Sequence, residues 1–157
     1  MCGIAGYIDH RAQLGETALS ARARAMADTL ATRGPDGDGV WCNAAAGIAL
    51  GHRRLAIIDP SAAGHQPMLS ACRRYAISYN GEIYNYAELA RDLAAEGVTV
   101  SGGSDTAVLL AACTHWGIAE ALGRSVGMFA FALWDGVDGA LWLARDRLGI
   151  KPLYWYA

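Results

Sequence analysis

The sequence predicts a layered α+β domain in which two stacked sheets lie between helices. Apolar runs such as "MFAFALWD" lack a polar face, which is typical of strands that are covered on both sides. Segments with apolar residues at helical spacing alternate with these strands, and short glycine-rich turns separate the two kinds. The chain has 157 residues, enough to bury one core without disulfide bonds. We therefore expect a single domain.

The first half of the chain alternates strands, one helix and loops. Residues 4–8 form a short apolar run that predicts a buried strand, and the apolar stripe over 16–31 predicts a helix of about four turns. The segment "TRGPDGDG" (32–39) contains three glycines and a proline, so it predicts a loop. Two strands separated by a turn are expected within 39–59, and a second loop follows over 60–68.

The middle of the chain combines a strand with a capped helix. Within 73–86 an apolar strand runs into a turn that carries polar side chains. Asn85 with Glu88 three residues later predicts a capping box for a helix that continues through Leu93. Gly97 is expected to end this helix.

The last third of the chain predicts two helices and a hairpin. A strand is expected at 98–100, a capped helix in the second half of 101–117, and a shorter helix in 118–127. The apolar strand 128–135 is expected to pair with 140–146 across a "GVDG" turn. The order of the strands within the sheets does not follow from these patterns.

The charge balance excludes several classes of partner. The formal net charge is −2, so we expect no binding of nucleic acid or of an anionic membrane. No apolar run approaches the length of about 18 residues that a transmembrane helix needs, and the N-terminus lacks a basic and apolar leader. We therefore expect a cytoplasmic protein whose four cysteines are reduced. Because none of them forms a CxxC pair, we expect no metal site.

A cysteine directly behind the initiator Met is the most informative single residue. Aminopeptidases remove Met1 when the next side chain is small, which would give Cys2 a free α-amine beside its own thiol. That amine, with an ordinary pKa of about 7.7–8.0, could serve as the base for the sulfur. The strand that follows would hold the thiol in place. The alternative is an inert thiol that merely follows Met1.

Three further segments offer groups that thiol-dependent acyl transfer needs. Asn80 and Gly81 could donate a side-chain and a backbone N–H to an oxyanion, although Asn-Gly is also a common hairpin turn. Arg54 could bind a carboxylate, or it could be a surface arginine at the start of a strand. Asp105 could pair with an ammonium group, or it could be an ordinary helix N-cap.

Seven ordered segments resemble one known family. Together they resemble the glutaminase domain of glutamine-dependent asparagine synthetases, which are class II, N-terminal-nucleophile glutamine amidotransferases. The resemblance covers essentially the whole chain and implies an Ntn-hydrolase-like four-layer αββα sandwich. The segments are "MCGIAGYID", "RGPDGDG", "GHRRLAIID", "YNGEIYNYAEL", "GSDTAVLL", "GMFAFALWD" and "ARDRLGIKPLYW".

The resemblance implies a role for each candidate residue. Cys2 would be the nucleophile that attacks L-glutamine, its amine the base, and Asn80 with Gly81 the oxyanion hole. Arg54 would bind the α-carboxylate of glutamine and Asp105 its α-ammonium. The same pocket would be lined by Leu55, Ala56, Ile57, Ile58 and Glu82. The loop that closes over glutamine would contain Arg33, Gly34, Pro35 and Asp36.

The resemblance also implies partners and cofactors. Hydrolysis of glutamine would need no cofactor, whereas ATP and Mg²⁺ would belong to a synthetase domain or subunit that accepts the ammonia. The family continues beyond "LYWYA" through further strands into that domain. We therefore expect this chain to lack both those strands and the synthetase domain. Thr32 stands where the family often has His, and Ala107 stands where an acidic residue often follows Ser-Asp-Thr. A homodimer is left open.

Two other functions remain open at this stage. The segment "VTVSGGSDTAVLL" resembles the pyrophosphate-binding loop of ATP pyrophosphatases, in which glycine N–H groups surround a phosphate at a helix N-terminus. A non-catalytic module that only binds a synthetase partner is the other alternative. Retention of Met1 would favour that module, because an acylated amine cannot act as a base.

Overall fold

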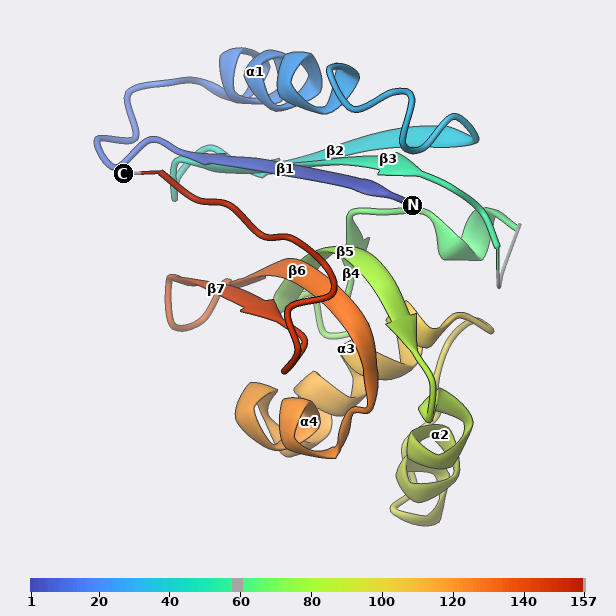
Figure 1. Ribbon diagram of the computed structural model, residues 1–157. Helices are drawn as coiled ribbons and strands as arrows, with labels where there is room; N and C mark the ends of the chain where they lie inside the picture. The colour runs from blue at the N-terminus through green and yellow to red at the C-terminus, as the bar shows by residue number, and fades with distance from the viewer. Residues whose placement is uncertain (58–60, 157) are drawn as a thin grey trace.

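The computed structural model describes residues 1–57 and 61–156, and the chain folds into four layers (Figure 1). One helix covers a three-stranded sheet, which stacks on a four-stranded sheet whose far face carries the remaining helices. This arrangement is the α+β sandwich that the sequence predicts. The elements are β1 (Gly3–Ile8), α1 (Glu16–Asp28), β2 (Gly37–Asn43), β3 (Ile48–Arg54), η1 (Ala62–Gly64), β4 (Met68–Leu69), β5 (Tyr75–Ile83), α2 (Tyr86–Ala95), α3 (Asp105–Trp116), α4 (Ile118–Arg124), β6 (Gly127–Asp135) and β7 (Ala140–Arg145).

The first sheet has the order β1-β3-β2 and is antiparallel throughout. Helix α1 packs on its outer face through Leu19 and Ala23. A side chain at Gly51 of β3 would lie 2.8 Å from the Ala23 carbonyl oxygen, so this glycine lets the helix approach the sheet closely. Strand β1 pairs along its full length, from Gly3 opposite Arg53, and the start of the chain is therefore fixed.

The second sheet has the order β4-β5-β6-β7 and is also antiparallel. Its inner face packs against the first sheet through Ala76 and Trp134, which meet Leu50 of β3. The outer face packs against the helices in a larger core that includes Phe131 and Leu109. The predicted strand 128–135 and its hairpin with 140–146 are confirmed, with β6 buried along most of its length.

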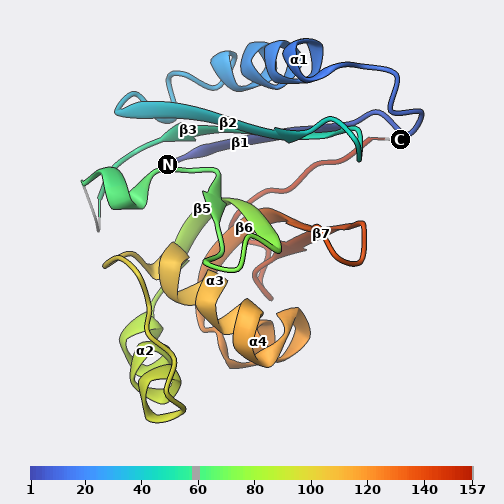
Figure 2. The same cartoon turned by 180° about the vertical axis from the view of Figure 1, so that it is seen from behind.

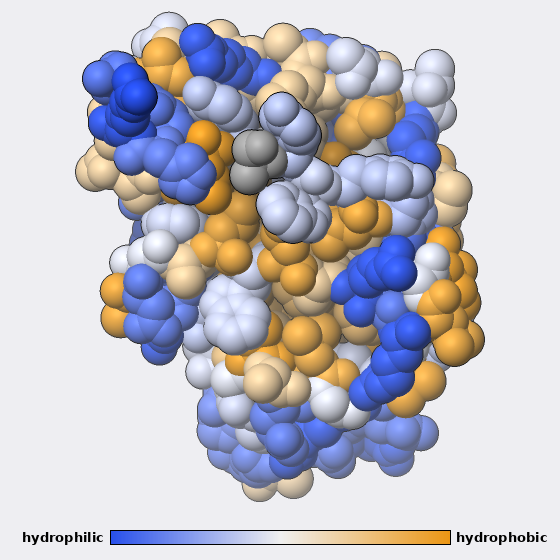
Figure 3. Space-filling model, turned by 60° about the vertical axis from the view of Figure 1, so that its left-hand side comes forward, coloured by the Kyte–Doolittle hydropathy of each residue, from blue (hydrophilic) through white to orange (hydrophobic). Residues whose placement is uncertain are grey.

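The segment after β7 runs back past the second sheet toward the first sheet in both views (Figures 1 and 2). Figure 3 looks at this side of the molecule, and hydrophobic residues gather across the middle of the face. The exposed apolar side chains of β7 and the segment after it are Trp142, Leu143, Leu148, Ile150, Tyr154, Trp155 and Tyr156. No helix in the described ranges is long and apolar enough to cross a membrane.

Two predicted boundaries around α1 and β2 are wrong. The helix ends at Asp28, not residue 31, because the chain continues in tighter turns held by hydrogen bonds between residues three apart. The predicted loop 32–39 is shorter, since β2 begins at Gly37. A Cβ at Gly39 would overlap the carbonyl oxygen of Gln66, so this glycine serves close packing and not a turn.

Two further predictions around α2 are also wrong. Residues 98–100 form no strand, although Val98 and Val100 pack against the core. Asn85 is the N-cap of α2, but its side chain makes no capping hydrogen bond. It instead accepts from the Val126 N–H and donates to the Arg124 carbonyl oxygen, which fastens the α4–β6 connection to the end of β5. The capped helix after Ser104 is confirmed, because the Ser104 hydroxyl accepts from the Ala107 N–H.

A buried histidine joins the two sheets. His52 of β3 is fully buried, and its Nδ1 lies 3.2 Å from the hydroxyl of Ser78 in β5. The Ser78 hydroxyl donates to the Gly51 carbonyl oxygen, so it accepts its second hydrogen bond from the imidazole. Burial, with smaller contributions from the charges of Arg54 and His65, lowers the pKa of His52 to about 3. The folded protein therefore holds this imidazole neutral.

We expect this histidine to make folding stability depend on pH. A folded-state pKa below the unfolded value of 6.5 gives stability that is complete above pH 6.5 and is lost as the pH falls toward 3. Between pH 7 and pH 5 the free energy of unfolding should fall by about 2 kcal/mol, from about 1.36 kcal/mol for each unit of pKa difference. Urea unfolding at several pH values measures this slope.

His52→Gln should remove the slope between pH 7 and pH 5, even though the variant is less stable overall. His10→Gln alters an exposed histidine and should leave the slope unchanged. An unchanged slope in His52→Gln would show that the imidazole is not the group that titrates. The buried Asp135, whose pKa is lowered to about 2 mainly by its hydrogen bond from Arg74, acts only at lower pH.

Candidate active site

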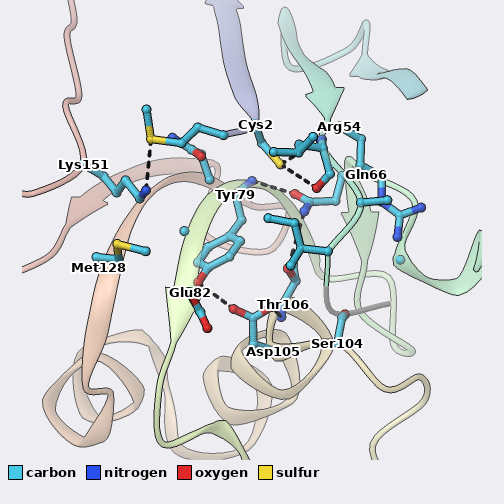
Figure 4. A pocket seen from close by; sticks show the side chains of 17 residues that line it. Cys2, Arg54, Gln66, Tyr79, Glu82, Ser104, Asp105, Thr106, Met128 and Lys151 are labelled. Atoms are coloured by element: carbon cyan, nitrogen blue, oxygen red, sulfur yellow. Dashed lines mark hydrogen bonds between the residues drawn. The ribbon is translucent and has the colours of Figure 1, made fainter. Parts of the chain in front are cut away.

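A pocket of about 150 Å³ opens where the N-terminus, the segment after β3, β5 and the start of α3 meet (Figure 4). Its lining also includes Met128 at the start of β6 and Lys151 in the C-terminal segment. Cys2 lies at one end of the pocket in Figure 4, and Asp105 lies at the other. Segments that are up to 150 residues apart in the sequence thus share one cavity.

The thiol of Cys2 lies against the main chain that follows β3. The Leu55 N–H donates to Sγ at 3.4 Å, and Sγ lies 3.6 Å from the Leu55 carbonyl oxygen, to which the thiol can donate. Arg33 Nε donates to the Cys2 carbonyl oxygen at 3.3 Å. Cys2, the predicted nucleophile, is therefore half-buried in the pocket, with Leu55 contacting its sulfur and Arg33 its carbonyl oxygen.

The exposed edge of β5 is the central feature of the pocket. Strand β4 is only two residues long, so it pairs with β5 at Ala76 and Ile77 and leaves the rest of that edge without a neighbouring strand. Side chains fill the edge instead. Gln66 Oε1 accepts from the Tyr79 N–H at 2.7 Å, and Asp105 Oδ2 accepts from the Ile83 N–H at 2.9 Å.

Between these two positions lies Gly81. Alternate residues of a strand direct their N–H groups to the same side, so Gly81 points to the same open edge as Tyr79 and Ile83. Among the described residues, none accepts a hydrogen bond from the Gly81 N–H. A Cβ here would overlap the Met128 carbonyl oxygen and lie 2.6 Å from Phe129 Cα, so only glycine fits beside β6. The pocket therefore contains a rigidly held backbone donor, the Gly81 N–H, that has no acceptor among the described residues.

Asn80 presents its side chain on the opposite face of β5 from Tyr79, toward the first sheet. The side chain is 4% exposed and lines the pocket. Within residues 1–57 and 61–156, no partner accepts from its amide. The hairpin-turn alternative for Asn80-Gly81 is wrong, because both residues are paired within the nine-residue strand, opposite Ala130 and Phe129.

Asp105 is the first residue of α3 and is almost fully buried. Oδ2 accepts from the Tyr79 hydroxyl and the Ile83 N–H, both at 2.9 Å, while Oδ1 accepts from the Thr106 N–H. Burial and the neighbouring carboxylate raise the pKa of Tyr79, so this hydroxyl remains a donor. The ordinary N-cap alternative for Asp105 is wrong, since Ser104 caps the helix. Oδ1 keeps accepting capacity toward the pocket.

The segment after β3 forms one wall. Arg54 ends β3 and is half-buried, and its Nη1 donates to the Ser61 carbonyl oxygen at 2.9 Å. Glu82 is exposed at the pocket rim, and Ile57 is 75% exposed. Ile58 lies outside the described residues. The predicted lining residues that the structure brings to this pocket are Arg54, Leu55, Ala56, Ile57, Asn80, Gly81, Glu82 and Asp105.

The predicted glutamine loop, Arg33–Asp36, lies beside the pocket and does not line it. The Asp36 carboxylate accepts from the Ala56 N–H at 2.9 Å, and the Asp36 N–H donates to the Arg54 carbonyl oxygen. A Cβ at Gly34 would overlap the Arg53 carbonyl group. The segment is therefore packed against the end of β3, where it supports the wall that holds the thiol.

Three residues of the pocket are not among the sequence-based candidates. Gln66 and Tyr79 fix the open edge of β5, and Lys151 brings a buried cation into the cavity. Tyr79 and Lys151 fall within two of the segments that resemble the family, but the resemblance implies no role for either, and Gln66 lies in a segment that predicts a loop. No local pattern marks them, because their roles arise from contacts across the fold.

The alternative ATP-binding loop lacks its structural context. Such a loop follows a strand of a parallel sheet, but residues 98–100 form no strand and every described ladder is antiparallel. No three His, Cys, Asp or Glu side chains of the described ranges come together in a way that could hold a metal ion. All four cysteines are free thiols.

The whole chain, residues 1–157, matches the glutamine amidotransferase domain family. It is 40% identical over 99% of its length to asparagine synthetase [glutamine-hydrolyzing] 3 of Bacillus subtilis. It is 43% identical over 98% of its length to a putative asparagine synthetase [glutamine-hydrolyzing] of Mycobacterium tuberculosis. In both comparisons the chain spans about a quarter (25%) of the relative's length.

A solved structure of glutamine phosphoribosylpyrophosphate amidotransferase from B. subtilis resembles this fold. The TM-score is 0.57 and the identity 25%, over 68% of this chain and 24% of that one. The match supports the assignment of the two stacked sheets to the Ntn-hydrolase class. Because the family match extends over every residue, the chain belongs to the glutamine amidotransferase domain family.

Proposed function

We propose that this domain hydrolyses the side-chain amide of L-glutamine through a thioester on Cys2 and passes the ammonia to a synthetase-type acceptor. One observation carries the proposal. The Cys2 thiol, the free Gly81 N–H and the Asn80 amide line the same pocket, which is the set of groups that thiol-dependent acyl transfer requires. Removal of Met1 is the first step, because it frees the α-amine that acts as base.

The first half of the reaction forms the thioester. The α-amine takes the proton of the thiol, and the sulfur forms a bond to the carboxamide carbon of glutamine. The carbonyl oxygen becomes negatively charged and accepts hydrogen bonds from Asn80 and Gly81. The C–N bond then breaks as the proton on the amine passes to the leaving nitrogen. Ammonia departs, and a γ-glutamyl thioester remains on Cys2.

The second half releases glutamate. The neutral amine takes a proton from a water molecule, whose oxygen attacks the thioester carbon. The same two donors hold the new oxyanion, and the C–S bond breaks as the sulfur leaves and the proton returns to it. Both tetrahedral intermediates would therefore use the same two donors, Asn80 and Gly81.

Arg54 and Asp105 suit the two charged ends of the substrate. The Arg54 guanidinium at the end of β3 would bind the α-carboxylate, and the buried Asp105 would accept from the α-ammonium through Oδ1. The space between them would be lined by Leu55, Ala56, Ile57 and Glu82. The segment Arg33–Asp36 would close over the bound glutamine. Asp36 would then lose the hydrogen bond that it accepts from the Ala56 N–H.

The lengths of the relatives support a synthetase-type acceptor. Those named asparagine synthetase [glutamine-hydrolyzing] are about four times as long as this chain, so the acceptor would be a further domain or a partner subunit that binds ATP and Mg²⁺. The exposed apolar side chains of β7 and the segment after it support a covering partner on that face. The glutaminase step itself would need no cofactor, and the free thiols fit a cytoplasmic location.

We expect an electrophilic glutamine analogue to label Cys2 once per chain, with intact mass showing that Met1 has been lost. Cys72 is the matched control thiol, because it is exposed and its hydrogen bond with Ser70 lowers its pKa. Labelling should persist in Cys72→Ser and disappear in Cys2→Ser. A retained Met1 with no adduct would favour a non-catalytic module.

Asn80→Ala should lower kcat for glutamine hydrolysis by about 10²–10³-fold, because one oxyanion donor is lost, while KM changes little. Steady-state ammonia release measures both constants. Asn43→Ala, at the far end of β2, is the control and should keep the wild-type rate. Unchanged kcat in Asn80→Ala would remove this residue from the oxyanion site.

A further inference from the structure

Lys151 is a buried cation inside the pocket. Lys151 is 5% exposed. Figure 4 shows its side chain pointing toward the N-terminus from the side of the pocket opposite Arg54. Nζ lies 3.1 Å from Sδ of Met1. Within the described ranges, no carboxylate lies within ion-pair distance of this ammonium. A buried charge without a counter-ion is costly, so its retention beside the reacting groups calls for a purpose.

The turn before Lys151 holds it in place. The buried Asp146 carboxylate accepts from the N–H groups of Ile150, Lys151 and Phe129 at 2.8, 2.9 and 3.2 Å. Burial alone would raise the pKa of Asp146, but these donors outweigh it and hold the pKa below its ordinary value. Gly149 adopts a φ of +67°, which the turn requires. The Lys151 backbone is thus held by a turn after β7 that is hydrogen-bonded to Phe129 of β6.

Removal of Met1 changes the surroundings of this cation. Met1 is bonded directly to the Cys2 nitrogen, so loss of the thioether leaves Nζ facing the side of the pocket on which the new α-amine appears. The other charged side chains of the pocket are Arg54, Glu82 and Asp105, and Arg33, outside the lining, donates to the Cys2 carbonyl oxygen. Glu82 is exposed at the rim, and Asp105 lies at the far end and already accepts three hydrogen bonds. Neither neutralises Lys151.

We propose that the Lys151 ammonium keeps the α-amine of Cys2 neutral, so that it can accept the thiol proton at physiological pH. The inference rests on the proposed function and adds to it the group that sets the strength of the base. A positive charge on the same side of the pocket disfavours protonation of the amine and lowers its pKa. At an effective dielectric constant near 20, this interaction corresponds to about one pKa unit or more. Lys151 acts through the amine and is a positioning residue.

Lys151→Met tests this role, because methionine keeps much of the length of the side chain and removes the charge. We expect the acidic limb of the pH profile of kcat/KM to move about one unit higher. Activity at pH 7 should fall about tenfold and recover near pH 9. Lys151→Arg should keep the wild-type limb, and Arg145→Met, which removes an exposed cation near the same turn, should not move it.

A second measurement is independent of hydrolysis. In matured protein labelled with ¹⁵N-cysteine, the α-amine signal of Cys2 should titrate about one unit higher in Lys151→Met than in the wild type. A loss of activity that is equal at every pH, with an unchanged amine titration, would assign Lys151 a purely structural role and overturn the inference. If the amine titration differs between the wild type and Lys151→Met, but the wild type releases no ammonia from glutamine, the proposed function alone would be overturned.

Discussion

The open edge of β5 is the constraint on which the site depends. A strand that lacks a neighbour leaves a row of backbone donors and acceptors, and each must find a partner or face water. Here β4 stops after two residues, and side chains from two distant segments take its place, Gln66 at the Tyr79 N–H and Asp105 at the Ile83 N–H. The donor between them, the Gly81 N–H, has no acceptor in the described part of the chain. A longer β4 would pair that donor and remove the oxyanion site we propose.

The same edge explains why Asp105 differs from an ordinary carboxylate at a helix start. It ties α3 to β5 through the Tyr79 hydroxyl and the Ile83 N–H, so its position is fixed before any substrate arrives. A substrate ammonium would then meet a preorganised acceptor, and little conformational entropy would be lost on binding. The carboxylate can serve structure and binding together because its two oxygens accept in several directions. Replacing it would loosen the edge as well as the substrate site.

Local patterns predicted much of this molecule, because several elements carry their signals within a few residues. The apolar runs of β1 and β6 and the Ser104 cap of α3 are examples, and family resemblance placed Cys2 and Gly81 in one pocket. The glycines misled the prediction of loops: Gly39 fits beside Gln66 within a paired strand, which only the tertiary fold reveals. Contacts of this kind join residues far apart in sequence, and no periodicity records them.

The N-terminus illustrates how the fold converts a chain end into a fixed reactive group. Chain ends ordinarily fray, but β1 pairs along its whole length with β3, and Leu55 holds the Cys2 sulfur from the segment that β3 leads into. The proposed nucleophile therefore depends on the first sheet, while the proposed oxyanion donors belong to the second. Packing between the sheets, with buried His52 against Ser78, sets the separation of the two halves of the site. Because a shift of about 1 Å between catalytic groups can cost about 10²-fold in rate, the proposed reaction would require this interface to be stable.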